Sequence, residues 1–274
     1  MQQLSPWGIL NETFAIICKR IRVLTVLAAI VYMPTVMVAL AAELLGLRHT
    51  IQEYLQSGSI SLDSLAYIMG LVIITFVSMT IGFAVVSVAV GQHLIDERIS
   101  VRGCYKRVLW RLFSVIFASI TLLISLVIAV GGVVLIIPTL VAMTFILYAS
   151  MTIPVITFEG LKYTDGIKRS FQLVHKELPR VILGLVLIGL LTVGLYVTLT
   201  LALGMIDSIV GKMPMVALFV QFISGLVANC VLTMVVGISI TLLYLDVRFR
   251  KEKLDLEILK RELTWHPHTA GLTQ

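Results

Sequence analysis

The chain has 274 residues, of which 59% are hydrophobic and only 13% are charged, and its formal net charge is +6. Soluble domains keep about a quarter of their residues charged, so this composition excludes a water-soluble fold. Long apolar runs instead predict an all-α integral membrane protein. The basic residues flank those runs, where anionic lipid headgroups are the nearest counter-charge. We therefore expect membrane lipids as partners, and no nucleic acid.

Six apolar stretches are long enough to cross a membrane. A helix needs about 20 apolar residues to cross about 30 Å of hydrocarbon, because each residue rises 1.5 Å. We predict transmembrane helices at about residues 23–45, 65–94, 112–135, 139–158, 181–205 and 214–245. The membrane domain then covers residues 1–250, and residues 251–274 form a cytoplasmic tail.

Lys and Arg residues lie almost entirely on one side of these spans. Of the 21, only Arg48 and Lys212 fall in loops that follow an odd-numbered span. Because cytoplasmic loops retain positive charge, both termini are expected in the cytoplasm, with the chain in the inner membrane. A signal peptide cleaved after Ala39-Leu40-Ala41 is the alternative, but 41 residues is long for a signal peptide.

Three amphipathic segments are predicted on the cytoplasmic side, each leading into an odd-numbered span. The first begins at Ser5-Pro6, an N-cap followed by a proline at the first helical position, and the others begin at Ser100 and Thr164. The apolar face of the first segment is expected to contain Trp7, Leu10, Phe14 and Ile17. A capped amphipathic helix followed by two spans thus occurs three times, which suggests a diverged threefold repeat.

Such helices are expected to lie in the inner leaflet interface, with basic side chains toward lipid phosphates. The candidate headgroup contacts are Arg102, Lys106, Arg107, Arg111, Lys168 and Arg169. The alternative is that the three helices only anchor the spans.

The sixth predicted span carries a polar stripe. Its members recur at helical spacing or lie beside that row, and they are Gln221, Ser224, Asn229 and Thr233. Such a stripe either lines a transport cavity or bonds to a neighbouring helix. We prefer helix packing, and the expected partners on the fifth span are Thr192, Tyr196 and Thr200. No ionisable residue falls near the middle of any span, which disfavours an ion-coupled pump.

The sequence contains no recognisable catalytic motif. A phosphate-binding loop, a nucleophile elbow, a zinc-protease motif and paired carboxylates are all missing, so we expect no catalytic residue, cofactor or metal. His266 and His268 could supply two metal donors, but they have no acidic or cysteine neighbours, and we expect a solvated tail.

Several short motifs resemble the membrane domain family associated with glycerophosphoryl diester phosphodiesterases. They are Ile153-Pro154-Val155 leading into Phe158-Glu159-Gly160, then Gly166-Ile167-Lys168-Arg169-Ser170, and the end of the sixth span. The positions that carry the resemblance are Pro138, Pro154, Glu159, Gly160, Arg169, Ser170, Tyr244, Asp246, Arg248 and Arg250. The resemblance implies a multi-span bacterial module that occurs alone or fused to an enzyme. This sequence lacks the enzyme's barrel domain, so the resemblance implies no hydrolase activity here.

Glu159 lies shortly before the third amphipathic helix, and we expect it to pair with Arg169 or Lys162 at the membrane edge. The whole pattern predicts a non-enzymatic membrane module that binds or organises lipids, a protein partner or a second copy of itself. Two alternatives stay open. One is a transporter of a small or lipidic solute, with Asn229 and Tyr196 at its cavity. The other is a scaffold that docks an enzyme on a helical tail, through Leu254, Ile258 and Leu259.

Overall fold

The computed structural model describes residues 5–44, 62–95, 97, 99–131, 136–210, 214–252 and 257–260. Within these residues, every regular element is a helix. Six helical stretches are long and apolar enough to cross a membrane. The predicted class, an all-α multi-pass membrane protein, is therefore confirmed. Parts of the predictions lie outside the described residues, namely the ends of the first and third spans, the side chain of Gln221, and most of the tail with His266 and His268.

The long helices match the predicted spans closely. Their bounds are α1 Pro6–Leu44, α3 Leu62–Leu94, α5 Leu112–Gly131, α6 Ile136–Ala149 with α7 Thr152–Glu159, α9 Leu178–Val210 and α10 Pro214–Glu252. Both α9 and α10 are longer than about 20 residues, so each can tilt in a bilayer or extend beyond it.

The fourth predicted span, residues 139–158, is interrupted between α6 and α7 at Ser150 and Met151. Pro154 explains the position of the break. Proline has no N–H to donate to the carbonyl four residues earlier, which belongs to Ser150, and its ring clashes with that carbonyl. The proline therefore interrupts the helix four residues before its own position.

The predicted amphipathic segments are present as helices. The second is α4, Val101–Trp110, and the third is α8, Tyr163–Lys176. Ser100 caps α4, where its hydroxyl accepts a hydrogen bond from the Gly103 N–H at 3.2 Å. The first segment is continuous with α1, and a kink at Arg20, with φ −128° and ψ 20°, separates it from the span.

The first amphipathic segment packs on the protein through only part of its predicted apolar face, because Leu10 is buried and Ile17 packs against the core. Trp7 and Phe14 are exposed, whereas Ile9, Thr13 and Ile16 are buried. The packed face includes a threonine because Thr13 donates its hydroxyl proton to the Ile9 carbonyl within the same helix. Trp7 and Phe14 are left for the surrounding lipid.

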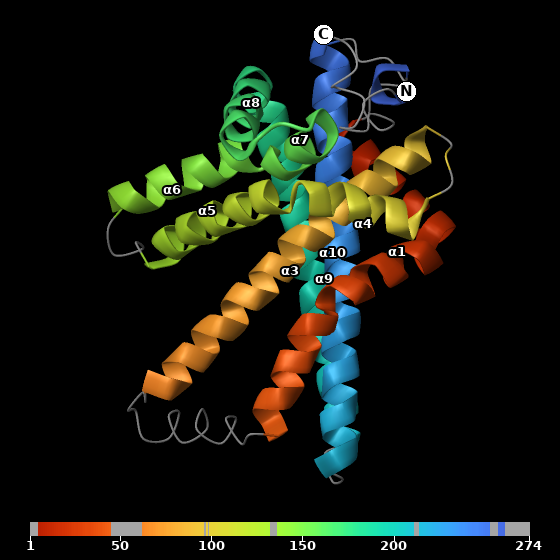
Figure 1. Cartoon of the computed structure of the whole chain (residues 1–274), viewed down its shortest axis with the longest axis vertical. Coiled ribbons are helices and arrows are strands. Elements are labelled where there is room, and N and C mark those ends of the chain that lie inside the picture. Colours follow the sequence, from red (N-terminus) through yellow and green to blue (C-terminus); the bar gives the residue numbers. More distant parts are fainter. Residues whose placement is uncertain are drawn as a thin grey trace.

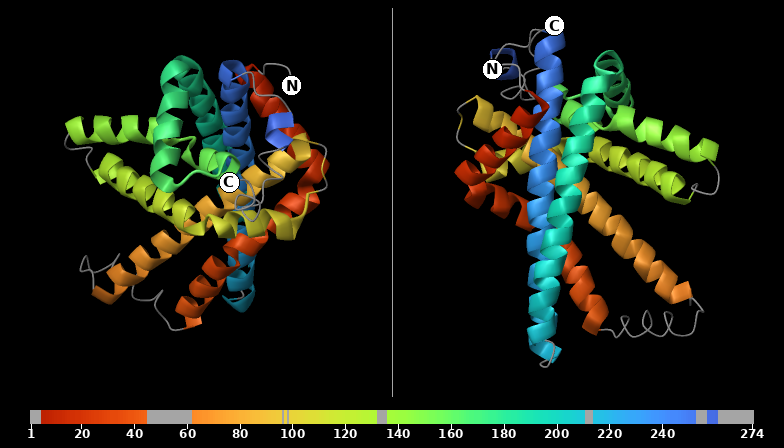
Figure 2. Two further views of the ribbon diagram at one scale, coloured as in Figure 1. Left: turned by 45° about the horizontal axis from the view of Figure 1, so that its top comes forward. Right: turned by 180° about the vertical axis from the view of Figure 1, so that it is seen from behind.

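The long helices follow one another in three pairs, α1 with α3, α5 with α6, and α9 with α10, and α1 also packs along α10 (Figure 1). The pairs meet near α4, α7 and α8 and point away from there in different directions, as both views in Figure 2 show. α10 is the central element, and it contacts α1, α3, α7, α8 and α9. An amphipathic helix precedes each pair, as predicted. The common origin of the three units stays a prediction.

The core lies where the pairs meet, which is also the end that carries the basic helices. Three stretches are buried throughout, at residues 84–91, 151–158 and 241–248. Toward the other end no described side chain is buried at residues 33–41, 189–206 or 222–229. These three helix segments are apolar and are not covered by protein, so lipid must cover them.

Hydroxyl pairs join α10 to its neighbours within the core. The pairs are Thr13 with Ser239 at 3.1 Å, Tyr32 with Thr233 at 2.6 Å, and Ser87 with Thr241 at 2.8 Å. The first two connect α10 to α1, and the third connects it to α3. Hydrogen bonds between helices contribute to association in a membrane, where lipid tails are as apolar as leucine.

Candidate functional site

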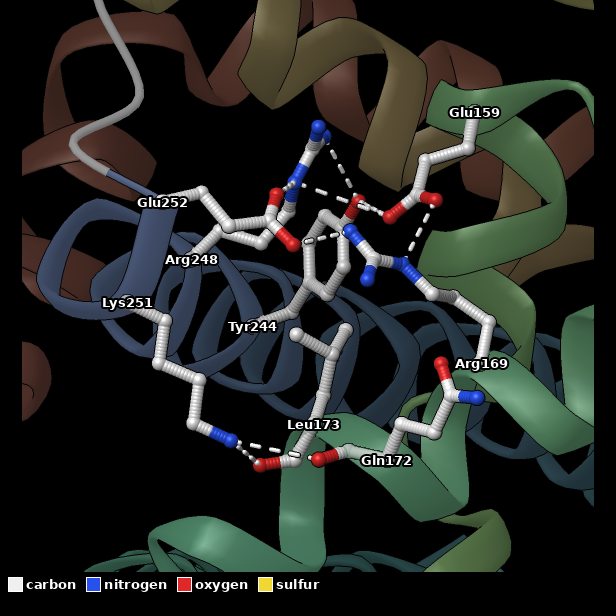
Figure 3. A network of polar contacts seen from close by, with 8 residues as sticks. All are labelled: Glu159, Arg169, Gln172, Leu173, Tyr244, Arg248, Lys251 and Glu252. Atoms are coloured by element: carbon white, nitrogen blue, oxygen red, sulfur yellow. Dashed lines mark hydrogen bonds and ion pairs between the residues drawn. The ribbon is translucent and has the colours of Figure 1, made fainter.

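A cluster of charged side chains joins α7, α8 and α10 at the basic end of the molecule (Figure 3). We call it the charged cluster, and its members are Glu159, Arg169, Tyr244, Arg248 and Glu252. The Nε of Arg169 donates to Oε2 of Glu159 at 2.9 Å, and the Tyr244 hydroxyl donates to Oε1 of Glu159 at 3.0 Å. The predicted pairing of Glu159 with Arg169 is therefore confirmed.

The α10 side of the charged cluster is built from residues four apart, which share one face of the helix. Arg248 donates from Nε to Glu252 at 3.1 Å and from Nη1 to the Tyr244 hydroxyl at 3.0 Å. Its side chain is only 5% exposed, and Glu159 Oε1 lies 3.6 Å from its Nε. Arg169 also pairs with Glu252. Two carboxylates thus neutralise two guanidinium groups, one of which, that of Arg248, is buried.

The electrostatic balance within the cluster keeps Arg169 charged. Burial alone lowers the pKa of Arg169, but the charge of Glu159 and the hydrogen bonds to Glu252 and Glu159 outweigh this effect. The pKa is therefore raised above its ordinary value. Arg169 therefore stays positively charged at physiological pH.

A second ion-pair group lies on another face of the same turns of α10. Asp246 is buried, and its Oδ2 accepts from the Nε of Arg180 at 2.8 Å and from the Nε of Arg250 at 3.2 Å. Lys251 donates from Nζ to the backbone carbonyls of Gln172 at 3.2 Å and Leu173 at 2.6 Å. Carbonyls at the end of a helix lack partners within it, so Lys251 fixes the end of α8 to α10.

Two arginines pack against the C-terminal end of α7, Arg107 from α4 and Arg111 from the position directly after α4. Arg107 donates from Nε to the Thr157 carbonyl at 3.2 Å and from Nη2 to the Phe158 carbonyl at 3.4 Å. Gly160 follows with φ 67°, a left-handed conformation that suits glycine at a helix end. The guanidinium of Arg111 packs so closely on Gly160 that a Cβ there would lie 2.7 Å from its Nη2. Both arginines therefore hold the end of α7.

The candidate headgroup contacts separate into two kinds. Arg107, Arg111 and Arg169 face protein groups, as described above. Arg102 and Lys106 on α4 are exposed, and so is Lys168 on α8. The first three serve the fold, and the last three remain accessible to lipid.

An open groove of about 470 Å³ runs along α4. It is lined by Val101, Arg102, Tyr105, Lys106, Leu109 and Trp110. Leu109 is 60% exposed and Trp110 is 61% exposed. The groove therefore places two cations beside apolar and aromatic surface that faces outward.

No known protein family, curated protein or solved structure matches the chain. The resemblance to the membrane domain family of the phosphodiesterases therefore stays a prediction. Four of the positions that carry it nevertheless lie together in the charged cluster, namely Glu159, Arg169, Tyr244 and Arg248 (Figure 3).

Three of the resembling positions serve other purposes. Pro138 is exposed in the first turn of α6, far along the chain from the cluster. Pro154 sets the break before α7. Ser170 is buried, and its hydroxyl donates to the Tyr148 carbonyl at 2.7 Å, which connects α8 to α6.

Two members of the polar stripe on α10, Thr233 and Asn229, bond elsewhere than to the predicted partners on the fifth span. Thr233 is buried and bonds Tyr32 on α1. Asn229 donates from Nδ2 to the Gly225 carbonyl of its own helix at 2.8 Å, and Ser224 is half-buried. The expected partners on α9 are also used differently. Thr192 and Thr200 donate to carbonyls of their own helix, and Tyr196 is 56% exposed.

Glu252 and Lys251 are the site residues that the sequence analysis missed. The signal was present, because Tyr244, Arg248 and Glu252 recur every four residues and must share a face. In the tail, Leu259 is buried against the core, while Ile258 is exposed. The buried leucine is used within the chain, which weakens the idea that the tail docks an enzyme.

Proposed function

We propose that the protein is a non-enzymatic module of the inner membrane that binds anionic lipid headgroups at its cytoplasmic face. The observation that carries the proposal is the groove along α4, where Arg102 and Lys106 lie beside exposed Leu109 and Trp110. Guanidinium and ammonium groups bind phosphate oxygens. Tryptophan and leucine beside them suit the boundary between headgroups and acyl chains.

The groove is preorganised because α4 is fixed to the rest of the protein. Cys104 and Val108 are buried in the core, and the Tyr105 hydroxyl donates to the Leu27 carbonyl of α1 at 2.6 Å. Arg107 is held by the end of α7. A lipid therefore meets a helix face that does not need to rearrange, which limits the entropy lost on binding.

The magnitude of the effect follows from the two exposed cations. Each basic residue near an anionic membrane surface contributes about 1 kcal/mol. Removing both Arg102 and Lys106 should therefore weaken binding of an anionic lipid roughly 30-fold, since 1.4 kcal/mol is about a factor of ten. Binding of a zwitterionic lipid should change little.

We further propose membership of the phosphodiesterase-associated membrane domain family, with both termini in the cytoplasm. Support for the family comes from the meeting of Glu159, Arg169, Tyr244 and Arg248 in the charged cluster, although they lie far apart in the sequence. Support for the orientation comes from the basic residues that surround it.

The test is native mass spectrometry of the full-length protein in a mild detergent, titrated with phosphatidylglycerol or phosphatidylcholine. The double variant Arg102→Gln/Lys106→Gln is compared with Lys162→Gln/Lys176→Gln, which removes the same charge from exposed positions at the two ends of α8. We expect phosphatidylglycerol binding to fall only in the α4 variant. Equal losses in both variants would show a general charge effect, and a retained protein subunit in place of lipid would favour a scaffold.

A further inference from the structure

A small cavity lies beside the break between α6 and α7, inside the core. Its lining includes Ser87 of α3, Ser150 and Pro154 at the break, and Gly237 of α10. About 10 Å³ of it admits the centre of a water molecule. A single water needs roughly 10–15 Å³ by this measure, so the cavity has room for one water and little else.

The break leaves polar groups of both kinds without helical partners. The Ser150 carbonyl loses its usual donor, because residue 154 is a proline. The Ser150 Oγ atom is buried and makes no hydrogen bond within the part of the chain that the structure describes. The first N–H groups of α7 also lack helical acceptors, and no side chain caps this end.

A broken helix at membrane depth requires compensation for these groups. The bilayer core contains no water, so the hydrogen-bond partners of these groups must come from the protein or from a trapped water molecule. Ser87 is the nearest candidate across the cavity. Its hydroxyl bonds the Phe83 carbonyl and Thr241, and a hydroxyl oxygen accepts two hydrogen bonds, so a lone pair remains.

We propose that this cavity binds one ordered water molecule, which bridges Ser150 to Ser87 and solvates the break. Water fits better than an ion for a chemical reason. The end of α6 offers carbonyl acceptors and the start of α7 offers N–H donors, and only a neutral ligand that both donates and accepts satisfies the two. The cavity lining contains no carboxylate that would neutralise a cation.

The direct test is a density map of the full-length protein in lipid at better than about 2.3 Å. We expect a peak within hydrogen-bond distance of Ser150 Oγ, about 2.7–3.0 Å away. A map that resolves other buried waters but shows no peak here would overturn the proposal. A second data set with Rb⁺ in place of Na⁺ identifies the ligand, because an anomalous signal at the site would assign it to a cation.

Variants provide an independent test through thermal unfolding in detergent. Ser150→Ala should lower Tm, because the water loses a partner. Ser119→Ala is the matched control with a smaller shift, since Ser119 is buried but its hydroxyl donates to the Val115 carbonyl of its own helix. A Ser150→Ala shift no larger than that of Ser119→Ala, or a higher Tm for Ser150→Ala, would exclude a bridging water.

Discussion

Replacing Glu159 with glutamine tests whether the charged cluster holds α7 against α8 and α10. Glutamine keeps the size of the side chain but removes its charge, so both the Arg169 bond and the Tyr244 bond become weaker. Hydrogen bonds to charged groups contribute about 1.5–3 kcal/mol and neutral ones about 1 kcal/mol. Two such bonds place the expected loss at about 2 kcal/mol.

That value is below the 3–5 kcal/mol typical of breaking a fully buried ion pair. Two features of the structure lower it. Glu252 still pairs with both Arg169 and Arg248 after the change, and the Arg169 side chain is 27% exposed and can recruit water.

The assay is reversible unfolding of the purified protein in mixed detergent micelles. Glu177→Gln is the matched control, because it makes the same change at a half-buried carboxylate just after α8. We expect the control to lose less than about 0.5 kcal/mol, as ordinary surface substitutions do. If Glu159→Gln were no more destabilising than Glu177→Gln, the charged cluster would not be what holds these three helices together.

Four further substitutions test the packing of other helices against α10. Gly184→Ala should destabilise the protein by about 1–3 kcal/mol, because the added Cβ would lie 2.9 Å from a leucine side chain of α10. Gly189→Ala on the same helix meets open space, and it should be neutral or stabilising in the same unfolding assay. Thr233→Val should cost about 0.6–1.7 kcal/mol, the range for hydrogen bonds between membrane helices. If Tyr32→Phe leaves stability unchanged, the hydrogen bond between Tyr32 and Thr233 does not stabilise the contact between α1 and α10.

The features that the bilayer dictates could be predicted from the sequence. Helix length follows from the thickness of the hydrocarbon, so the six spans were predicted with most ends within a few residues. The α4 and α8 helices were also predictable, because Ser100 is a good N-cap and apolar residues recur at helical spacing. Both signals are local, and neither depends on which helices become neighbours.

The partners of polar side chains could not be predicted in this way. Asn229, Thr192 and Thr200 all bond carbonyls four residues earlier in their own helices. A polar residue that is satisfied locally needs no neighbour, so a polar stripe does not identify the helix that packs on it. Thr233 differs only because Tyr32 reaches it from α1.

The unequal burial of the long helices follows from the same physics. Lipid tails solvate an apolar helix face as well as another helix does, so hydrophobicity gives membrane helices little reason to associate. Association then requires polar bonds, ion pairs or close backbone contact, and in the described residues these gather at the basic end. In α9 only 17% of the most apolar 18-residue stretch is buried, against 56% in α10. α10 carries the hydroxyl pairs and most of the ion pairs, whereas α9 relies on Arg180 and Gly184 near its start. The three pairs of helices therefore stay together where these groups are and separate where only lipid-like side chains remain.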